Sequence, residues 1–82
     1  MTAVTFEFFA NVARLAGASQ IAVEVGDAAT VGDAIAALKA LRPDLAGAVE
    51  ACACVSGDAI VRRRDPLPAD RRIALLPPVA GG

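Results

Sequence analysis

The sequence predicts an α+β domain in which one mixed β-sheet is covered on one face by one main helix. Three observations predict it. Apolar and polar residues alternate near the start of the chain, as in a half-buried strand. One central stretch repeats its apolar residues at helical spacing, and the second half has only short apolar runs between turn residues. At 82 residues the chain has the size of a single small domain.

The first half of the chain begins with two predicted strands. Residues 3–9 alternate, with Val4 and Phe6 on the face that turns inward, and residues 20–25 alternate again. The segment between them is too long for a tight turn, so we expect a short helical turn that ends at Gly17. The two strands are expected to pair as an antiparallel hairpin.

The main helix is predicted to begin after Thr30 and to end near Leu41. Thr30 is a typical N-cap residue, and Asp33, three residues later, completes an aspartate version of the capping box. Pro43 ends the helix, because the residue before a proline avoids the helical region. The apolar stripe expected to pack on the sheet consists of Val31, Ile35, Leu38 and Leu41.

The second half is predicted to complete the sheet. Residues 44–50 are expected to form an irregular loop or a short turn around Gly47, and residues 65–70 a proline-rich loop anchored by Leu67. The strands expected here lie at 51–55, 59–61 and 71–76. A two-layer fold follows, in which the first and last strands lie parallel at the centre. The uncovered face of the sheet is then available to a partner.

The two cysteines are expected to be buried and inert. Cys52 and Cys54 lie two residues apart on a predicted strand, where they point to the same face and are poorly placed to bridge each other. The chain has no histidine and no further cysteine, so it offers no further soft or imidazole ligand for a metal ion. We therefore expect no metal site. Two unbridged cysteines also fit a reducing compartment.

Composition argues against most function classes. Without histidine there is no Ser-His or Cys-His nucleophile pair, and no glycine-rich loop is followed by a lysine that could hold phosphate. A net charge of −1 argues against nucleic-acid binding. No signal peptide and no apolar run long enough for a membrane span is evident. We expect a cytoplasmic protein that is acted upon and has no active site of its own.

Arginines gather late in the chain, with five of the seven between Arg62 and Arg72. One interpretation is docking onto an acidic partner surface, which would speed association. The alternative is ordinary surface charge, which contributes little to stability. The sequence leaves both interpretations open.

The C-terminal segment, residues 77–82, is the most informative part of the chain. Pro77 and Pro78 stiffen the exit from the last strand, and Gly81 and Gly82 lack the Cβ atoms that would block entry into a narrow slot. A terminal carboxylate with a pKa of about 3.5 is an anion at neutral pH and must be activated, for example as an acyl-adenylate, before it reacts. We expect a flexible tail that is presented as a substrate. The alternative is an ordinary frayed end.

These residues resemble a known family. The tail Leu76-Pro77-Pro78-Val79-Ala80-Gly81-Gly82 resembles the Pro-Pro-Val-x-Gly-Gly end of the small subunit of molybdopterin synthase, a sulfur carrier with the β-grasp (ubiquitin-like) fold. The opening strand with Ala13-Arg14-Leu15-Ala16-Gly17, and the helix start Thr30-Val31-Gly32-Asp33, resemble the same family. One departure is Leu75-Leu76, where the family often has an aromatic residue before the prolines.

The resemblance implies a role for the tail. An adenylating enzyme would use ATP to activate the Gly82 carboxylate, and a sulfur donor would convert it to a thiocarboxylate. The tail would then enter the large subunit of molybdopterin synthase, within a heterotetramer, and donate sulfur to a pyranopterin precursor. Gly82 would react, and the residues held by the partner would be Gly81, Ala80, Val79, Pro78 and Pro77.

Other roles remain open for the same tail. It could belong to a sulfur carrier for thiazole synthesis, to a ubiquitin-like protein modifier, or to a plain interaction domain whose tail has no chemical role. We expect no bound cofactor, because ATP would be used by the activating enzyme.

Overall fold

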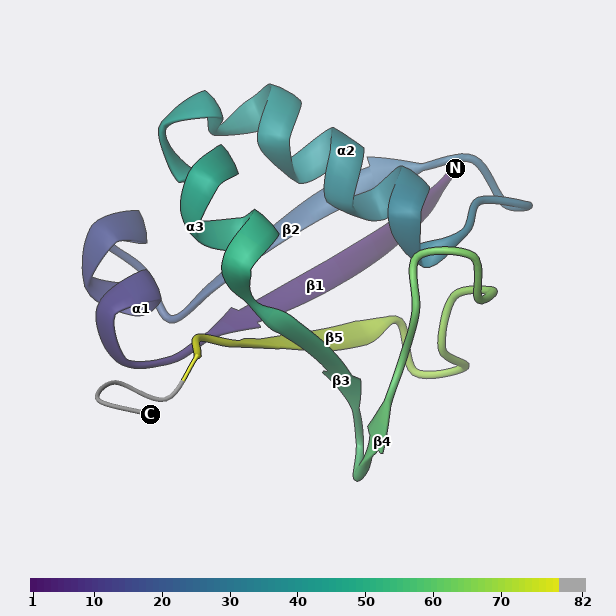
Figure 1. Ribbon diagram of the computed structural model, residues 1–82. Helices are drawn as coiled ribbons and strands as arrows, with labels where there is room; N and C mark the ends of the chain where they lie inside the picture. Colours follow the sequence, from purple (N-terminus) through teal and green to yellow (C-terminus); the bar gives the residue numbers. More distant parts are fainter. Residues whose placement is uncertain (79–82) are drawn as a thin grey trace.

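The computed structural model describes residues 1–78 and has one five-stranded mixed sheet with the strand order β2-β1-β5-β3-β4 (Figure 1). The fold is therefore the α+β arrangement that the sequence predicts. In chain order, the elements are β1 (Thr2–Phe8), α1 (Ala10–Ala16), β2 (Gln20–Val25), α2 (Val31–Leu41), the 3-10 turn η1 (Pro43–Leu45), α3 (Ala46–Ala51), β3 (Ala53–Ser56), β4 (Ala59–Ile60) and β5 (Arg72–Leu76).

The opening hairpin is confirmed. β1 and β2 pair antiparallel, with Thr2 opposite Val25 and Glu7 opposite Gln20. The segment between the two strands contains the short helix α1, which ends at Gly17. Gly17 has a φ of 70° and its N–H donates to the Ala13 carbonyl at 3.0 Å. A left-handed residue at this position ends a helix, and glycine adopts that conformation without a steric cost.

The start of α2 is also confirmed. The Thr30 N–H donates to the Asp33 carboxylate at 2.9 Å, and the Asp33 N–H donates to the Thr30 hydroxyl at 3.3 Å. Both bonds satisfy N–H groups near the helix start that have no partner within the helix. The residues of α2 that are buried against the sheet are Val31, Ala34, Ile35 and Leu38.

Two expectations about the following segment are wrong. Leu41 was expected in the buried stripe, but it is 57% exposed. Residues 44–50 were expected to be irregular, but they form the end of η1 and most of α3. The two errors share one physical cause: the chain turns back after α2, and Leu45 and Val49, which are 0% and 1% exposed, fill the core beyond Leu38.

The second half of the sheet places β5 at its centre. β5 pairs parallel with β1, with Phe8 opposite Leu75, and antiparallel with β3, with Ala53 opposite Leu76. This confirms the predicted parallel contact of the first and last strands. Leu67, from the loop before β5, packs against the core as expected.

The helices cover one face of the sheet. Figure 1 shows α2 and α3 above the strands, with α1 beside the ends of β1 and β5 and no helix below, within the residues described. The expected main helix is thus accompanied by two shorter ones. The buried core lies between these helices and the inner face of the sheet. No helix within residues 1–78 is long and apolar enough to cross a membrane.

Candidate functional site

The base of the predicted tail lies at the end of the central strand. Pro77 and Pro78 follow Leu76 directly; Pro77 is half-buried and Pro78 is exposed. Because proline has no N–H, neither residue can extend the ladder on both sides of β5. The prolines therefore set the point at which the chain leaves the sheet. The other predicted site residues, Val79, Ala80, Gly81 and Gly82, lie outside the described residues.

An apolar surface surrounds the base of the tail on the uncovered face. Side chains alternate along a strand, so Ala74 and Leu76 point away from the core residues Ile73 and Leu75. Phe9 has an extended backbone and follows Phe8, which is opposite Leu75. It therefore continues the same face beside Leu76. The remaining two members come from the hairpin of β3 and β4, and the surface consists of Phe9, Val55, Ile60, Ala74 and Leu76.

The exposure of this tail-base surface is unusual for its residue types. Ile60 is 76% exposed, Phe9 45% and Leu76 39%. Single exposed apolar residues are common on proteins, but apolar residues grouped on one sheet face are typical of interaction surfaces, which makes this surface a candidate docking site. Sequence reasoning missed Phe9 and Ile60 as site residues. The available signal was that Phe9 continues the polar side of the first strand's alternation, where a large apolar residue is out of place.

The same sheet face is polar toward β2. The Arg72 guanidinium donates to the Glu7 carboxylate at 2.6 Å and to the Gln20 side-chain oxygen at 3.3 Å. The hydrogen bond and charge of Glu7 raise the pKa of Arg72 above its usual value. The face is thus divided into an apolar part at Pro77 and an ion-paired part beside it.

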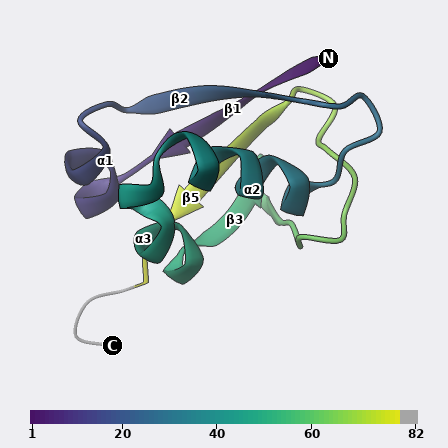
Figure 2. The same ribbon diagram turned by 90° about the horizontal axis from the view of Figure 1, so that it is seen from above.

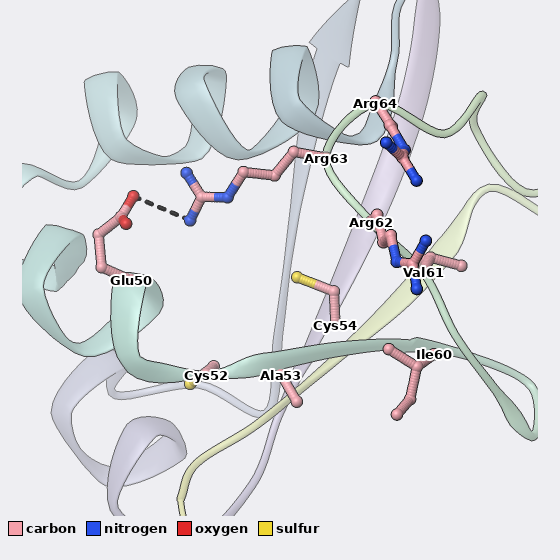
Figure 3. A pocket seen from close by; sticks show the side chains of 9 residues that line it. All are labelled: Glu50, Cys52, Ala53, Cys54, Ile60, Val61, Arg62, Arg63 and Arg64. Atoms are coloured by element: carbon pink, nitrogen blue, oxygen red, sulfur yellow. Dashed lines mark ion pairs between the residues drawn. The ribbon is translucent and has the colours of Figure 1, made fainter.

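A hollow of about 670 Å³ lies beside the β3–β4 hairpin and shares Ile60 with the tail-base surface (Figure 3). Cys54 points into it from β3, and Arg63 enters it from the loop after β4. Arg63 forms an ion pair with Glu50 at 2.9 Å, and Lys39 also pairs with Glu50. Figure 3 shows Arg62 and Arg64 pointing away from this pair, so the arginines do not converge on a common ligand.

The cysteines differ in part from their prediction. Both are half-buried rather than fully buried, and Cys52 lies before β3 as the C-cap of α3, where its thiol donates to the Ala48 carbonyl at 3.1 Å. The cause is the unexpected helix α3, which takes the place of the first residues of the predicted strand. Burial raises the pKa of both thiols, although the positive charge of Arg63 acts in the opposite direction on Cys54.

These thiols are therefore protonated at neutral pH and are poor nucleophiles. Within residues 1–78, no three histidine, cysteine or acidic residues lie close enough together to hold a metal ion.

Known proteins similar to this chain share its fold. A family model described as the ThiS family matches residues 6–82. The crystal structure of SAMP1 from Haloferax volcanii is 29% identical, with a TM-score of 0.86, and the match covers 99% of this chain and 100% of that one. No curated protein matches the chain in sequence.

Two further structures show the fold alone at lower identity. One, from Pyrococcus furiosus, is described as a candidate molybdopterin converting factor subunit 1; it is 21% identical with a TM-score of 0.81, over 96% of this chain and 100% of that one. The other belongs to a complex of subunits 1 and 2 of the molybdopterin-converting factor from Helicobacter pylori. It is 22% identical with a TM-score of 0.69, over 99% of this chain and 100% of that one.

Proposed function

Because the chain belongs to the ThiS family, we propose that it is a ubiquitin-like sulfur carrier whose C-terminal tail is the reacting group. The observation that supports the proposal is the position of Pro77, where the predicted tail begins. The chain leaves the central strand β5 at Pro77, beside the exposed apolar surface formed by Phe9, Ile60 and their neighbours. An activating enzyme that docks on this surface would hold the tail at one fixed distance from its own catalytic groups.

The chemistry of the tail begins with activation. A carboxylate oxygen of Gly82 attacks the α-phosphorus of ATP, and pyrophosphate leaves with the electrons of the broken P–O bond. A sulfur nucleophile at the oxidation level of hydrosulfide then attacks the acyl carbon, and AMP leaves. The product is a Gly82 thiocarboxylate. Gly81 and Gly82 suit this sequence because the absence of side chains lets the backbone approach the nucleotide closely.

The finer proposal is that the sulfur serves molybdenum cofactor synthesis. Two features support this assignment: the Pro77-Pro78-Val79 sequence, and the similarity of the fold to the molybdopterin-converting factor structures from Pyrococcus furiosus and Helicobacter pylori. The tail would enter the large subunit of the synthase and transfer its sulfur to the pyranopterin precursor. Pro77, Pro78, Val79, Ala80 and Gly81 would contact the large subunit along the tail.

A second function is favoured by a specific observation. The likeness to SAMP1 and to small archaeal modifier protein 1, both from Haloferax volcanii, supports conjugation of Gly82 to lysine amines of target proteins. The same adenylate serves both reactions, and only the nucleophile differs. A carrier for thiazole synthesis is a third candidate, supported by the family itself.

The proposal is tested by intact mass after incubation with the adenylating enzyme of the same organism, ATP and a sulfur source. Replacement of oxygen by sulfur adds about 16 Da, and the charged carboxylate requires prior activation. The chain without Gly82 must show no such change. A wild-type chain that keeps its mass under conditions in which the enzyme forms AMP would contradict the sulfur-carrier role.

The docking surface is tested in the same reaction. Ile60→Asp places a charge on the tail-base surface, and it should lower the rate of adenylation at least tenfold, because an unpaired carboxylate is costly to bury. The matched control is Leu41→Asp, which charges a similarly exposed apolar residue on the helical side. Equal losses in both variants would show that the tail-base surface has no special role.

The alternatives are distinguished by their products. Gly-Gly remnants in isopeptide linkage on lysines of other proteins would identify a modifier. Copurification of the chain with the large subunit of molybdopterin synthase would support a role in molybdopterin synthesis over one in thiazole synthesis. A plain interaction domain would keep its function after one residue is added beyond Gly82, whereas a carrier would lose it.

A further inference from the structure

The edge strand β2 has backbone N–H and C=O groups that are not used in its pairing with β1. β2 and β4 are the two edges of the sheet, and β4 has only two residues, Ala59 and Ile60. β2 has six, and its register with β1 runs without interruption from Thr2 opposite Val25 to Glu7 opposite Gln20. In Figure 2 the three helices lie on the same side of β2 as β5 and β3, so none of them covers the outer edge of β2.

The hydrogen bonds of the hairpin identify which β2 groups are free. The Phe8 N–H donates to the Ser19 carbonyl at 2.8 Å, so this opposed pair is a bonded pair. Bonded and non-bonded pairs alternate in an antiparallel ladder, so Ile21, Val23 and Val25 also form bonded pairs with β1. The N–H and C=O groups of the three residues between them point away from the sheet. These residues are Gln20, Ala22 and Glu24.

Edge strands in proteins usually carry features that prevent pairing. Lysine, proline and bulges are common ones. β2 has no lysine, proline or bulge in its sequence Gln20-Ile21-Ala22-Val23-Glu24-Val25, and its one charged residue is Glu24. Its exposed side chains, those of Gln20, Ala22 and Glu24, instead form a row that is small at the centre and polar at both ends.

We propose that β2 pairs antiparallel with β2 of a second copy of this chain, about a two-fold axis at Ala22. In this register Ala22 lies opposite Ala22 of the second copy, and Gln20 lies opposite Glu24. The two-fold axis repeats the Gln20–Glu24 pair, so there are three pairs in all. Each pair uses outward-pointing backbone groups, and together they give about six hydrogen bonds. Ile21, which is half-buried, then packs beside Val23 of the second copy on the inner face.

The side chains favour this register over its neighbours. The Gln20 oxygen accepts from Arg72 at 3.3 Å, which leaves the amide N–H₂ to donate to the opposed Glu24 carboxylate. A shift of the axis to Glu24 would place two carboxylates opposite each other, which is destabilising. A shift to Gln20 would leave most of the free groups unpaired. A shift of the axis to Ile21 or Val23 still pairs outward backbone groups, but it places Ala22 opposite Gln20 or opposite Glu24. Gln20 and Glu24 are therefore directly opposed only when the axis lies at Ala22.

The pairing leaves the candidate site free. β5 is parallel to β1 and both are antiparallel to β2, so the tail leaves the sheet near the Gln20 end. The two-fold axis places this end beside the Val25 end of the second copy. Pro77 of one copy and Pro77 of the other would therefore lie at opposite ends of one continuous sheet, and each copy would keep its own tail-base surface.

The test is sedimentation of the full chain from about 10 μM to about 1 mM, a range suited to an interface smaller than those of stable complexes. Wild type should move from monomer toward dimer. Ala22→Pro removes an N–H that β1 does not use, so it should keep the fold but weaken association at least tenfold. Gln20→Glu should weaken association about fivefold, because it places a carboxylate at position 20 opposite Glu24 in both symmetry-related pairs.

The decisive variant is the exchange Gln20→Glu with Glu24→Gln, which restores an amide opposite a carboxylate and should recover association. Ala36→Glu, on the exposed side of α2, adds the same charge as Gln20→Glu and is the matched control that should behave as wild type. A wild-type chain that stays monomeric at the highest concentration, or an exchange that fails to recover association, would overturn the proposal.

Amide hydrogen exchange gives a second readout. The N–H groups of Gln20, Ala22 and Glu24 should exchange more slowly as concentration rises, whereas those of Ile21 and Val23, already bonded to β1, should change little. Protection that appears elsewhere would show that copies associate through a different surface. Neither experiment depends on the tail chemistry, so this proposal and the sulfur-carrier role fail or hold separately.

Discussion

Two leucines three residues apart on α2 should respond very differently to truncation. Leu38 is 0% exposed and packs in the core, whereas Leu41 is 57% exposed at the end of the helix. Alanine at a buried leucine costs about 2–5 kcal/mol, because transfer and cavity costs add. We expect about 3 kcal/mol for Leu38→Ala. For Leu41→Ala we expect about 0.5 kcal/mol, typical of a surface substitution.

The loss at Leu38 is a large share of the total. A domain of this length has about 4–12 kcal/mol of stability. With a urea slope of about 1 kcal/mol per molar, the unfolding midpoint should fall by about 3 M for Leu38→Ala and by about 0.5 M for Leu41→Ala. Far-ultraviolet circular dichroism is the suitable probe, because the chain has no tryptophan or tyrosine.

The comparison tests how the end of α2 meets the core. Equal shifts for the two variants, at unchanged slope, would mean that Leu41 is packed as the sequence pattern predicts and that Leu45 does not fill the core in its place. A shift below about 1 M for Leu38→Ala would refute the burial argument itself, because it is smaller than any cavity-forming leucine substitution should give.

Three further predictions concern charge, thiols and glycine. The hydrogen bond from Arg42 lowers the pKa of Asp44 in the folded chain. The stabilisation from this pair is therefore present above the unfolded pKa of Asp44 and is lost as pH falls through the folded pKa. In acid titrations followed by circular dichroism, Asp44→Asn should therefore make the free energy of unfolding less dependent on pH below about pH 4. The pKa of Cys52 and of Cys54 is raised by burial, so iodoacetamide at pH 8 should alkylate the folded chain more slowly than the urea-unfolded chain, and equal rates would contradict this. Gly17→Ala should lower the melting temperature at a cost of about 1 kcal/mol because φ is positive there, whereas Gly47→Ala, in α3 with open space around it, should leave it equal or higher.

The elements that the sequence predicted correctly are those determined by residues close together in the chain. The Thr30–Asp33 capping box, the end of α1 at Gly17 and the alternation of β1 each rest on residues a few positions apart. The parallel pairing of β1 and β5 also followed, because the order of the predicted elements leaves the first and last strands to meet at the centre.

The segment after α2 could not be predicted in this way. α3 has six residues and contains Gly47, so its helical propensity is low, and it forms because Leu45 and Val49 are buried by contacts distant in sequence. The same holds for the tail-base surface: nothing near Ile60 indicates that it shares a face with Phe9 until the sheet brings their strands together. The predicted tail roles of Val79–Gly82 remain predictions.

The central position of β5 has a mechanical consequence. A partner that pulls on the chain at Pro77 pulls along β5, which is bonded to β1 on one side and to β3 on the other. The load is therefore shared in shear by both ladders at once, and several hydrogen bonds must break together. A tail attached to an edge strand such as β4 could be peeled away one bond at a time. A pull at Pro77 should therefore need a higher force to unfold the domain than the same pull at an edge strand.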